Sequence, residues 1–110
     1  MDKLNALDSF AALGQDTRLE AFRLLVRSGD AGMAAGEIAE KLGVRQNTMS
    51  ANLSVLHQAG LVRNRREGRS IRYYADFDGL RGLLEYLMED CCGGKPDICR
   101  PVLDAITCKC

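Results

Sequence analysis

Three cysteines lie close together near the C-terminus, in the segment CCGGKPDIC at positions 91–99. Cys91 and Cys92 are adjacent, and Cys99 follows after two glycines and a proline. Thiolates can form disulfides, take part in redox chemistry, bind zinc or bind a softer metal. Successive residues of a helix point about 100° apart, so Cys91 and Cys92 share one small ion only where the helix unwinds. The glycine pair at 93–94 allows such unwinding, and the following proline turns the chain so that Cys99 can return.

The number of cysteines and the residues around them favour some of these four kinds of chemistry over others. The chain has five cysteines, an odd number, all within its last 20 residues. A reducing compartment keeps such residues as thiols, which disfavours a disulfide framework. Three convergent thiolates without histidine or carboxylate suit a soft trivalent metalloid. Two other interpretations stay open: Cys91 could be only an apolar interface residue that continues a leucine stripe, and four cysteines could hold zinc, although no C-x-x-C pair occurs. Cys108 and Cys110, at the extreme terminus, are interpreted as accessory or incidental.

Length and composition favour one globular domain. The chain has 110 residues, of which 46% are hydrophobic and two are prolines. Neither a secretory leader nor a membrane-length apolar segment is present in the sequence, so we expect a cytoplasmic protein without a membrane partner. No base stands beside a thiol, and the Gly-Gly-Lys at 93–95 lacks the spacing of a phosphate-binding loop. We therefore do not expect an enzyme.

The formal net charge is zero, but its distribution is uneven. Residues 45–72 hold six arginines against the single acidic residue Glu67, an excess of five positive charges that acidic flanks cancel. Such a local excess in the middle of a chain predicts an anionic partner.

Hydrophobic periodicity predicts the elements that would position these charges. Five helices and one hairpin are expected, with glycines at most of the breaks. Four of the helices span Leu4–Leu13, Ala35–Leu42, Gln46–Ala59 and Phe77–Asp90, and the hairpin has two strands around the turn Glu67-Gly68-Arg69. The remaining helix, the second in the chain, is capped by Asp16 and is expected to bury Leu19, Phe22, Leu25 and Val26.

Two short helices around the tight turn at 43–45, followed by an arginine-rich hairpin, predict a winged helix-turn-helix. This is a mainly α fold with a β-hairpin wing. The second helix of such a unit lies in the DNA major groove, where polar or small side chains approach base edges. A polar helix face alone could simply be solvated, but the adjoining arginines favour DNA. The expected DNA-binding residues are Gln46, Asn47, Thr48, Ser50, Ala51 and Ser54 on the helix, and Arg66 and Arg69 at the wing tip.

Three segments in order, LGQDTRLEAFRLL, GEIAEKLGVRQNTMSANLSVLHQAGLV and RREGRSIRYYA, resemble the arsenic-repressor (ArsR/SmtB) family of bacterial winged-helix metal sensors. The resemblance runs from about Leu13 to Met88. It implies a homodimeric repressor whose first and last helices form the interface, bound to a partly palindromic operator in double-stranded DNA and released by an inducer. Many members carry histidines where this chain has Ala51 and Asn52.

The family places inducer sites in different elements, and most of their ligands are missing here. The third-helix arsenic site needs cysteines near positions 34 and 36, where this chain has alanine and glycine. The interface zinc site needs histidine along the last helix, but the single histidine, His57, lies in the fourth. A persulfide sensor needs a cysteine in the second helix, which has none. The resemblance thus implies As(III) or Sb(III) as the inducer, bound by Cys91, Cys92 and Cys99.

These expectations divide the chain into a DNA-binding and dimerisation domain, residues 1–90, and a cysteine-rich metalloid-binding tail, residues 91–110. Two alternatives share the same DNA-binding fold. One is a winged-helix repressor that responds to thiol oxidation, and the other is a DNA- or protein-binding module with a structural zinc in its tail.

Overall fold

The computed structural model describes residues 1–89 and 96–106 of the chain, so Cys91, Cys92, Cys108 and Cys110 lie outside the described residues. None of the helices in these two ranges combines the length and the apolar character needed to cross a membrane. In chain order the elements are α1 Lys3–Leu13, α2 Asp16–Ser28, the short 3₁₀ helix η1 Gly29–Ala31, β1 Met33–Ala34, α3 Ala35–Leu42, α4 Gln46–Gln58, β2 Val62–Glu67, β3 Ser70–Ala75, α5 Phe77–Leu87 and α6 Pro96–Ala105.

The predicted helix-turn-helix is confirmed. Helix α3 has the expected bounds, and Gly43 ends it in the left-handed conformation with φ 68°. Glycine adopts this conformation without a Cβ penalty, and its N–H then reaches the last carbonyls of the helix. The N–H of Val44 also donates to the Ala39 carbonyl, which tightens the turn before α4 begins at Gln46.

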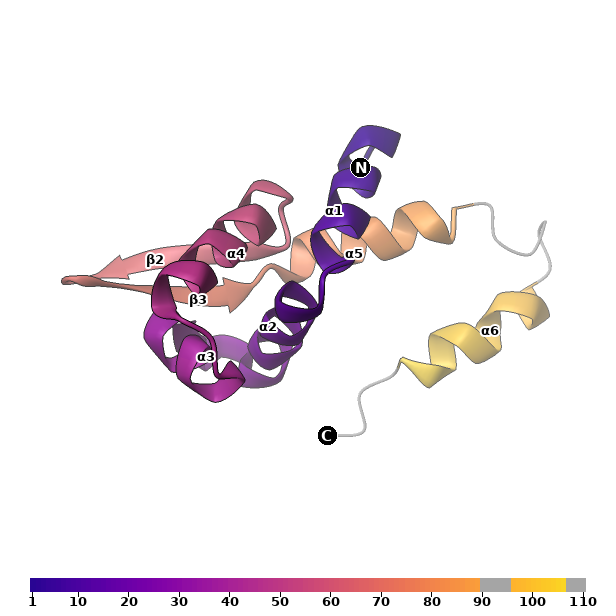
Figure 1. The fold of residues 1–110 in the computed structure, drawn as a ribbon. Helices are drawn as coiled ribbons and strands as arrows, with labels where there is room; N and C mark the ends of the chain where they lie inside the picture. The colour runs from indigo at the N-terminus through magenta and orange to yellow at the C-terminus, as the bar shows by residue number, and fades with distance from the viewer. Residues whose placement is uncertain (90–95, 107–110) are drawn as a thin grey trace.

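The predicted wing is also confirmed, and the sheet has one strand that was not predicted. Strands β2 and β3 pair antiparallel, with Glu67 opposite Ser70 across a two-residue turn that contains Gly68 at φ 62°. The short β1 pairs with β3, which gives the order β1-β3-β2. In Figure 1 the hairpin projects from the helical body as a long arm. A two-residue strand has no periodicity of its own, so only pairing reveals it.

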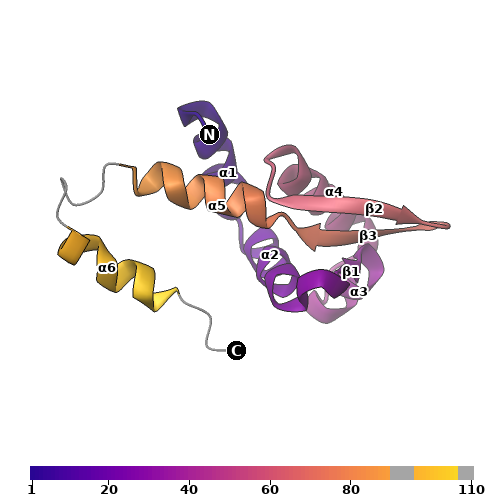
Figure 2. The same cartoon turned by 180° about the vertical axis from the view of Figure 1, so that it is seen from behind.

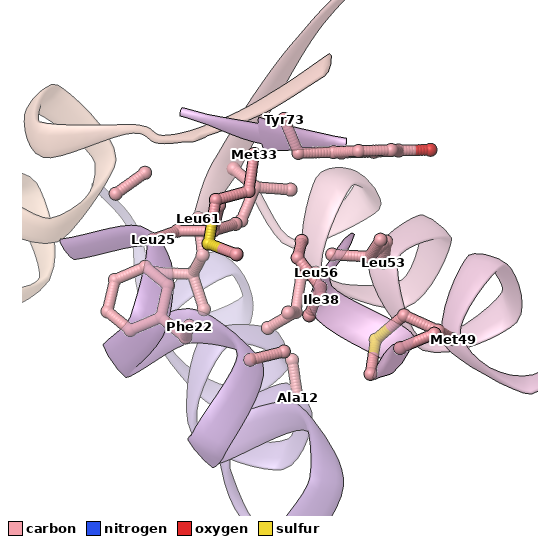
Figure 3. Close-up of a cluster of buried hydrophobic side chains, with 14 residues drawn as sticks. Ala12, Phe22, Leu25, Met33, Ile38, Met49, Leu53, Leu56, Leu61 and Tyr73 are labelled. Atoms are coloured by element: carbon pink, nitrogen blue, oxygen red, sulfur yellow. The ribbon is translucent and has the colours of Figure 1, made fainter. Parts of the chain in front are cut away.

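The core lies between the helix-turn-helix, α2 and the base of the sheet. Figure 3 shows side chains from all these elements gathered in one cluster. Leu25, Ile38, Met49, Leu53, Leu56 and Leu61 are fully buried in it. The periodic positions predicted for α3 and α4 thus face the interior, except that Leu42 is only partly buried.

Two expectations for α2 were wrong. Gln15, not Asp16, is the N-cap, because its side-chain oxygen accepts a hydrogen bond from the Arg18 backbone N–H at 2.8 Å. Leu19 is 41% exposed rather than buried, whereas Phe22 and Leu25 are buried. At about 100° per residue, Leu19 lies well to the side of the arc that carries Phe22 and Leu25 into the core.

Helix α1 has an unusual distribution of side-chain size. Its buried residues are small, namely Ala6, Ser9 and Ala12. Three of its large apolar residues face outward, with Leu4 73%, Leu7 52% and Phe10 42% exposed, whereas Leu13 is partly buried against the core. Helix α5 lies beside α1 (Figure 1) and also leaves leucines exposed, including Leu84 and Leu87. Its end at Leu87 precedes the predicted end at Asp90, which lies outside the described residues.

Helix α6 was not predicted. In Figures 1 and 2 it stands apart from the helical body, beyond the end of α5 and far from the wing. Four apolar residues of this segment are 49–62% exposed, Ile98, Val102, Leu103 and Ile106. Cys99 is the exception, at 8% exposed.

Candidate nucleic-acid interface

Burial of one face of α4 fixes which residues its other face presents. Met49, Leu53 and Leu56 are fully buried, at helical spacings of four and three. The opposite face therefore points outward. All six predicted residues of the helix are exposed: Gln46, Asn47, Thr48, Ser50, Ala51 and Ser54. They are uncharged and mostly small, so α4 can approach another surface closely.

Two asparagines of α4 are engaged within the molecule. The side-chain oxygen of Asn47 accepts a hydrogen bond from the Thr48 backbone N–H at 2.8 Å, which turns the Asn47 side chain toward the helix N-terminus. Asn52 is half-buried, and its side-chain oxygen accepts a hydrogen bond from the Arg18 guanidinium at 3.3 Å. Arg18 was not among the predicted functional residues, although its helical register with Phe22 and Leu25 is visible in the sequence.

A groove joins the first turns of α4 to the wing. It has a volume of about 210 Å³. From α4 it is lined by Gln46 and Ser50, and from the wing by Arg69 and Ile71; the start of α3 completes it. The fold thus brings predicted DNA-binding residues of the helix and of the wing tip to one concave surface, although they are separated by about 20 positions in the sequence.

The strand register sorts the wing arginines onto two faces. Alternate residues along one strand share a face, and so do residues that lie directly opposite each other on paired strands. Arg63 lies opposite Tyr74 and Arg65 lies opposite Arg72, so these arginines project from the face that turns away from the core. Arg66 lies opposite Ile71, on the same face as the buried Tyr73 but nearer the tip. Strand alternation predicted that the arginines divide between two faces, and the register shows which arginines of the two strands share a face.

Two of the arginines are held by Glu67. The Arg65 guanidinium donates to one carboxylate oxygen of Glu67 at 3.0 Å, and Arg72 donates to the other at 3.3 Å. The hydrogen bond from Arg65, followed by the interactions with Arg72, lowers the pKa of Glu67 below its ordinary value. The same bond raises the pKa of Arg65, which also contacts the hydroxyl and the ring face of Tyr74. Arg72 additionally donates to the Ala31 and Gly32 carbonyls, which ties the wing to the body.

The two arginines predicted to contact phosphate differ from these. Within residues 1–89 and 96–106, neither Arg66 nor Arg69 forms an ion pair, and Arg66 donates only to the Gly68 carbonyl at 3.3 Å. Both side chains are exposed at the wing tip. Their charges are therefore available to an anion, whereas those of Arg65 and Arg72 are partly neutralised.

Of the predicted metal-site residues, only Cys99 is described. It lies in the first turn and a half of α6, is buried, and is disulfide-bonded, whereas the sequence favoured free thiols. Among the described residues no group of three histidine, cysteine or acidic side chains could hold a metal ion. The other predicted ligands, Cys91 and Cys92, lie outside those residues, so the metal site stays a prediction.

Comparisons with known proteins point to one family. The family model described as a helix-turn-helix domain matches residues 13–65. Over 81 residues the chain is 40% identical to a Halobacterium salinarum protein named "Putative arsenical resistance operon repressor ArsR2"; the match covers 74% of this chain and 66% of that protein, just under two thirds of its length. It is 33% identical over 84 residues to the "Uncharacterized HTH-type transcriptional regulator MJ1325" of Methanocaldococcus jannaschii, covering 76% of this chain and 92% of that protein.

Solved structures agree with this result. The homodimeric winged helix-turn-helix DNA-binding domain of Mb0332 from Mycobacterium bovis, described as "a possible ArsR-family transcriptional regulator", superposes with a TM-score of 0.63 at 30% identity, covering 76% of this chain and 82% of that one. An ArsR-like transcriptional regulator from Rhodococcus sp. RHA1 gives 0.70 at 28% identity, covering 97% and 96%. The names of these relatives are those of transcriptional regulators rather than enzymes, which agrees with the prediction from the sequence. The matched fold and the similarity in sequence show that the chain belongs to the ArsR family of winged helix-turn-helix transcriptional repressors.

Proposed function

We propose that this repressor binds its operator as a homodimer and releases it when arsenite or antimonite binds the C-terminal cysteines. The observation that best supports specific DNA binding is the groove in which Gln46 and Ser50 of α4 lie beside Arg69 of the wing. Uncharged groups that read base edges and a cation that neutralises phosphate are the two components of a sequence-specific DNA interface.

In this proposal α4 lies in the major groove and the wing follows the backbone. The exposed residues Thr48, Ser50, Ala51 and Ser54 contact base edges, and Gln46 and Asn47 lie at the entrance of the DNA major groove. Arg66 and Arg69 contact phosphates, which position the protein without reading sequence. Substitutions on α4 should change the preference among operators, whereas substitutions at the wing tip should weaken binding to every duplex alike.

A second copy of the chain would cover the outward faces of α1 and α5. Leu4, Leu7 and Phe10 on α1 and Leu84 and Leu87 on α5 form an exposed apolar surface on two adjoining helices. A surface of this kind marks an interaction site rather than a solvated face. The related Mb0332 domain is homodimeric. A two-fold dimer presents two copies of α4, so the operator half-sites should lie about one helical turn apart.

The inducer site is assigned to residues 91–110, and the DNA-binding and dimerisation domain to residues 1–90. Each thiol that binds As(OH)₃ replaces one hydroxyl group and releases one water, so three cysteines give a neutral trithiolate. Cys99 is the described member of this donor set, and its disulfide must be reduced before its thiol can bind arsenic. The name of the Halobacterium relative refers to arsenical resistance, which favours the same inducer.

Release of the operator requires that arsenite binding at the cysteines beyond α5 changes the position of α4. A route exists in the packing, because Gly79 in the first turn of α5 lies directly against the Gly60 carbonyl, just after α4. Coupling between two sites in one protein is typically about 5- to 150-fold in affinity. We therefore expect arsenite to lower operator affinity by a factor in this range.

The test is fluorescence anisotropy of a labelled operator, selected from random duplexes by the reduced protein. Arsenite and antimonite should each release it, and zinc should not. Cys99→Ser should keep operator affinity and ignore arsenite, whereas the matched double variant Cys108→Ser, Cys110→Ser should respond like the wild type. If the double variant is the unresponsive one, the ligands are at the terminus and the assignment of Cys99 is wrong.

One observation favours a second candidate, a repressor that responds to thiol oxidation. Cys99 is disulfide-bonded in the structure, so its sulfur has a cysteine partner within reach. Forming that bond from two thiols transfers two electrons to an oxidant and releases two protons. The same titration distinguishes the candidates: release by peroxide without arsenite supports oxidation sensing, and release by arsenite under full reduction supports metalloid sensing.

A further inference from the structure

One arginine of α2 lies where a core residue is expected. Arg18, Phe22 and Leu25 are spaced by four and three, which places them on one face of the helix. Phe22 and Leu25 are buried, and Arg18 is half-buried at the end of the same row. A charge in such a position requires hydrogen-bond partners, since burying a polar group without them is costly.

The partners of Arg18 belong to two different helices. Its Nε donates to the Ala12 carbonyl at 2.7 Å, and one terminal nitrogen reaches the Ala11 carbonyl at 3.5 Å. Both carbonyls lie in the last turn of α1, where a cation also compensates the helix dipole. The other terminal nitrogen donates to the side-chain oxygen of Asn52, in the middle of α4, at 3.3 Å. Arg18 thus bridges α1 and α4.

A second polar contact joins the same two helices. Ser9 is fully buried among the small residues on the inner face of α1. Its hydroxyl donates to the carbonyl of Ala59, the C-cap of α4, at 3.3 Å. Helix α1 therefore holds α4 at two points, its middle through Arg18 and its C-terminal end through Ser9.

From these contacts we propose that Arg18 is a positioning residue for operator binding, which transmits the orientation of α1 to α4. The inference rests on the proposed function, in which α1 forms the dimer interface and α4 reads DNA. In that dimer the distance between the two α4 helices is set through each subunit's α1. A dimer meets two half-sites together only when this distance matches their spacing. Arg18 therefore contributes to specific binding without touching DNA bases.

The guanidinium is required for this bridge. Its nitrogens lie in one rigid plane and donate in several directions at once, whereas a lysine ammonium is a compact charge on a flexible stem. Arg18→Lys keeps the charge of the chain, and hence its non-specific attraction to phosphate, but cannot hold α1 and α4 together. Arg23→Lys is the matched control, because Arg23 lies on the same helix and, among the described residues, pairs with Glu20 at the surface.

The experiment compares two duplexes of equal length, the selected operator and a scrambled sequence, by fluorescence anisotropy at one salt concentration. Loss of one net hydrogen bond corresponds to a change of about 3- to 10-fold. We expect Arg18→Lys to lose about this factor on the operator and less than about 2-fold on the scrambled duplex. Arg23→Lys should match the wild type on both. Sedimentation should show that every variant remains a dimer.

A double-mutant cycle tests whether Arg18 acts through Asn52. If it does, Arg18→Lys combined with Asn52→Ala loses no more operator affinity than the larger single effect. Additive losses, equal losses on both duplexes, or wild-type operator affinity of Arg18→Lys would each overturn the inference. If Arg18→Lys does not fold, Ser9→Ala takes its place as the probe of the α1–α4 contact, with the same expected ratio. If the wild-type protein sediments as a monomer or selects no sequence, the proposed function itself fails.

Discussion

The part of the molecule from α2 to β3 and the part formed by α1, α5 and α6 treat large apolar side chains in opposite ways. In the first part six large apolar side chains are fully buried, although Leu19 and Ile71 are exposed, and polar or charged side chains cover much of α4 and the wing. In the second part the buried residues are mostly small, and large apolar residues such as Leu4, Leu87 and Ile98 are exposed.

This contrast shows that only the first part is complete within one chain. Its core is formed mainly by residues of α2, the helix-turn-helix and the sheet, and its polar outer surface is available to contact DNA. The second part leaves large apolar side chains exposed, which is typical of an interaction surface. The junctions between the parts, at Arg18, Ser9 and Gly79, are the contacts through which a change in one part can reach the other.

The same substitution should have different consequences in the two parts. Leu25→Ala removes a fully buried side chain and should lower the free energy of unfolding by about 2–5 kcal/mol. Leu4→Ala, at a position 73% exposed in the single chain, should change monomer stability little but weaken self-association. Urea unfolding at several protein concentrations, with sedimentation, measures both effects. Equal losses of stability independent of concentration would contradict the comparison.

The junction at α5 should tolerate no extra methyl group. Gly79→Ala places a Cβ against the backbone carbonyl of Gly60, which cannot move without shifting α5 from α4. We expect a loss of about 1–3 kcal/mol, as for overpacking in a core. The matched control is Gly82→Ala on the same helix, where the new Cβ meets only the flexible Met1 side chain at 3.6 Å.

Because alanine favours helix over glycine, Gly82→Ala should be neutral or stabilising by up to about 1 kcal/mol. In thermal unfolding, Gly79→Ala should therefore lower the midpoint temperature, and Gly82→Ala should leave it unchanged or raise it. A stabilising Gly79→Ala would show that the two parts are joined more loosely than the packing implies.

The wing should lose DNA affinity where an arginine is unpaired and gain it where a carboxylate is removed. Arg69→Ala should weaken binding to operator and scrambled duplexes by roughly 3- to 10-fold and reduce the slope of log K against log salt by about one. Arg81→Ala is the control from the second part, since Arg81 pairs with Asp78 on α5. An unchanged salt slope for Arg69→Ala would exclude its role at phosphate.

The smallest effect is expected at Glu67. Glu67→Gln releases Arg65 and Arg72 and removes a negative charge from the wing, so non-specific DNA affinity should rise about 2-fold. Since the folded protein lowers the pKa of Glu67, the ion pairs add stability above the ordinary glutamate pKa, and this contribution disappears as pH falls through the lowered value. Wild type should thus be slightly more stable than the variant at neutral pH, and the two should become equal in acid. A difference that persists in acid would point to another cause.

Much of the fold could be predicted from the sequence because it depends on local patterns. Helical spacing predicted α3 to the residue and gave the buried row of α4, glycine marked the turn at Gly43, and the change of period at Val62 marked the wing. The outward face of α4 followed from its buried face, so the exposure of Thr48 and Ser50 could also be anticipated. These features are set within a few residues along the chain.

Other features depend on which segments meet, and only the tertiary structure decided them. The pairing of β2 with β3 determined that Arg65 and Arg72 are held by Glu67 while Arg69 is not, and pairing with β3 created β1. Arg18 reaches Asn52 across 34 positions, and Ser9 reaches Ala59 across 50. Sequence periodicity reports which face of an element is apolar, but not which partner it contacts. The sequence thus determined the elements and their faces, and long-range packing determined which polar groups were already occupied and which remained free for DNA.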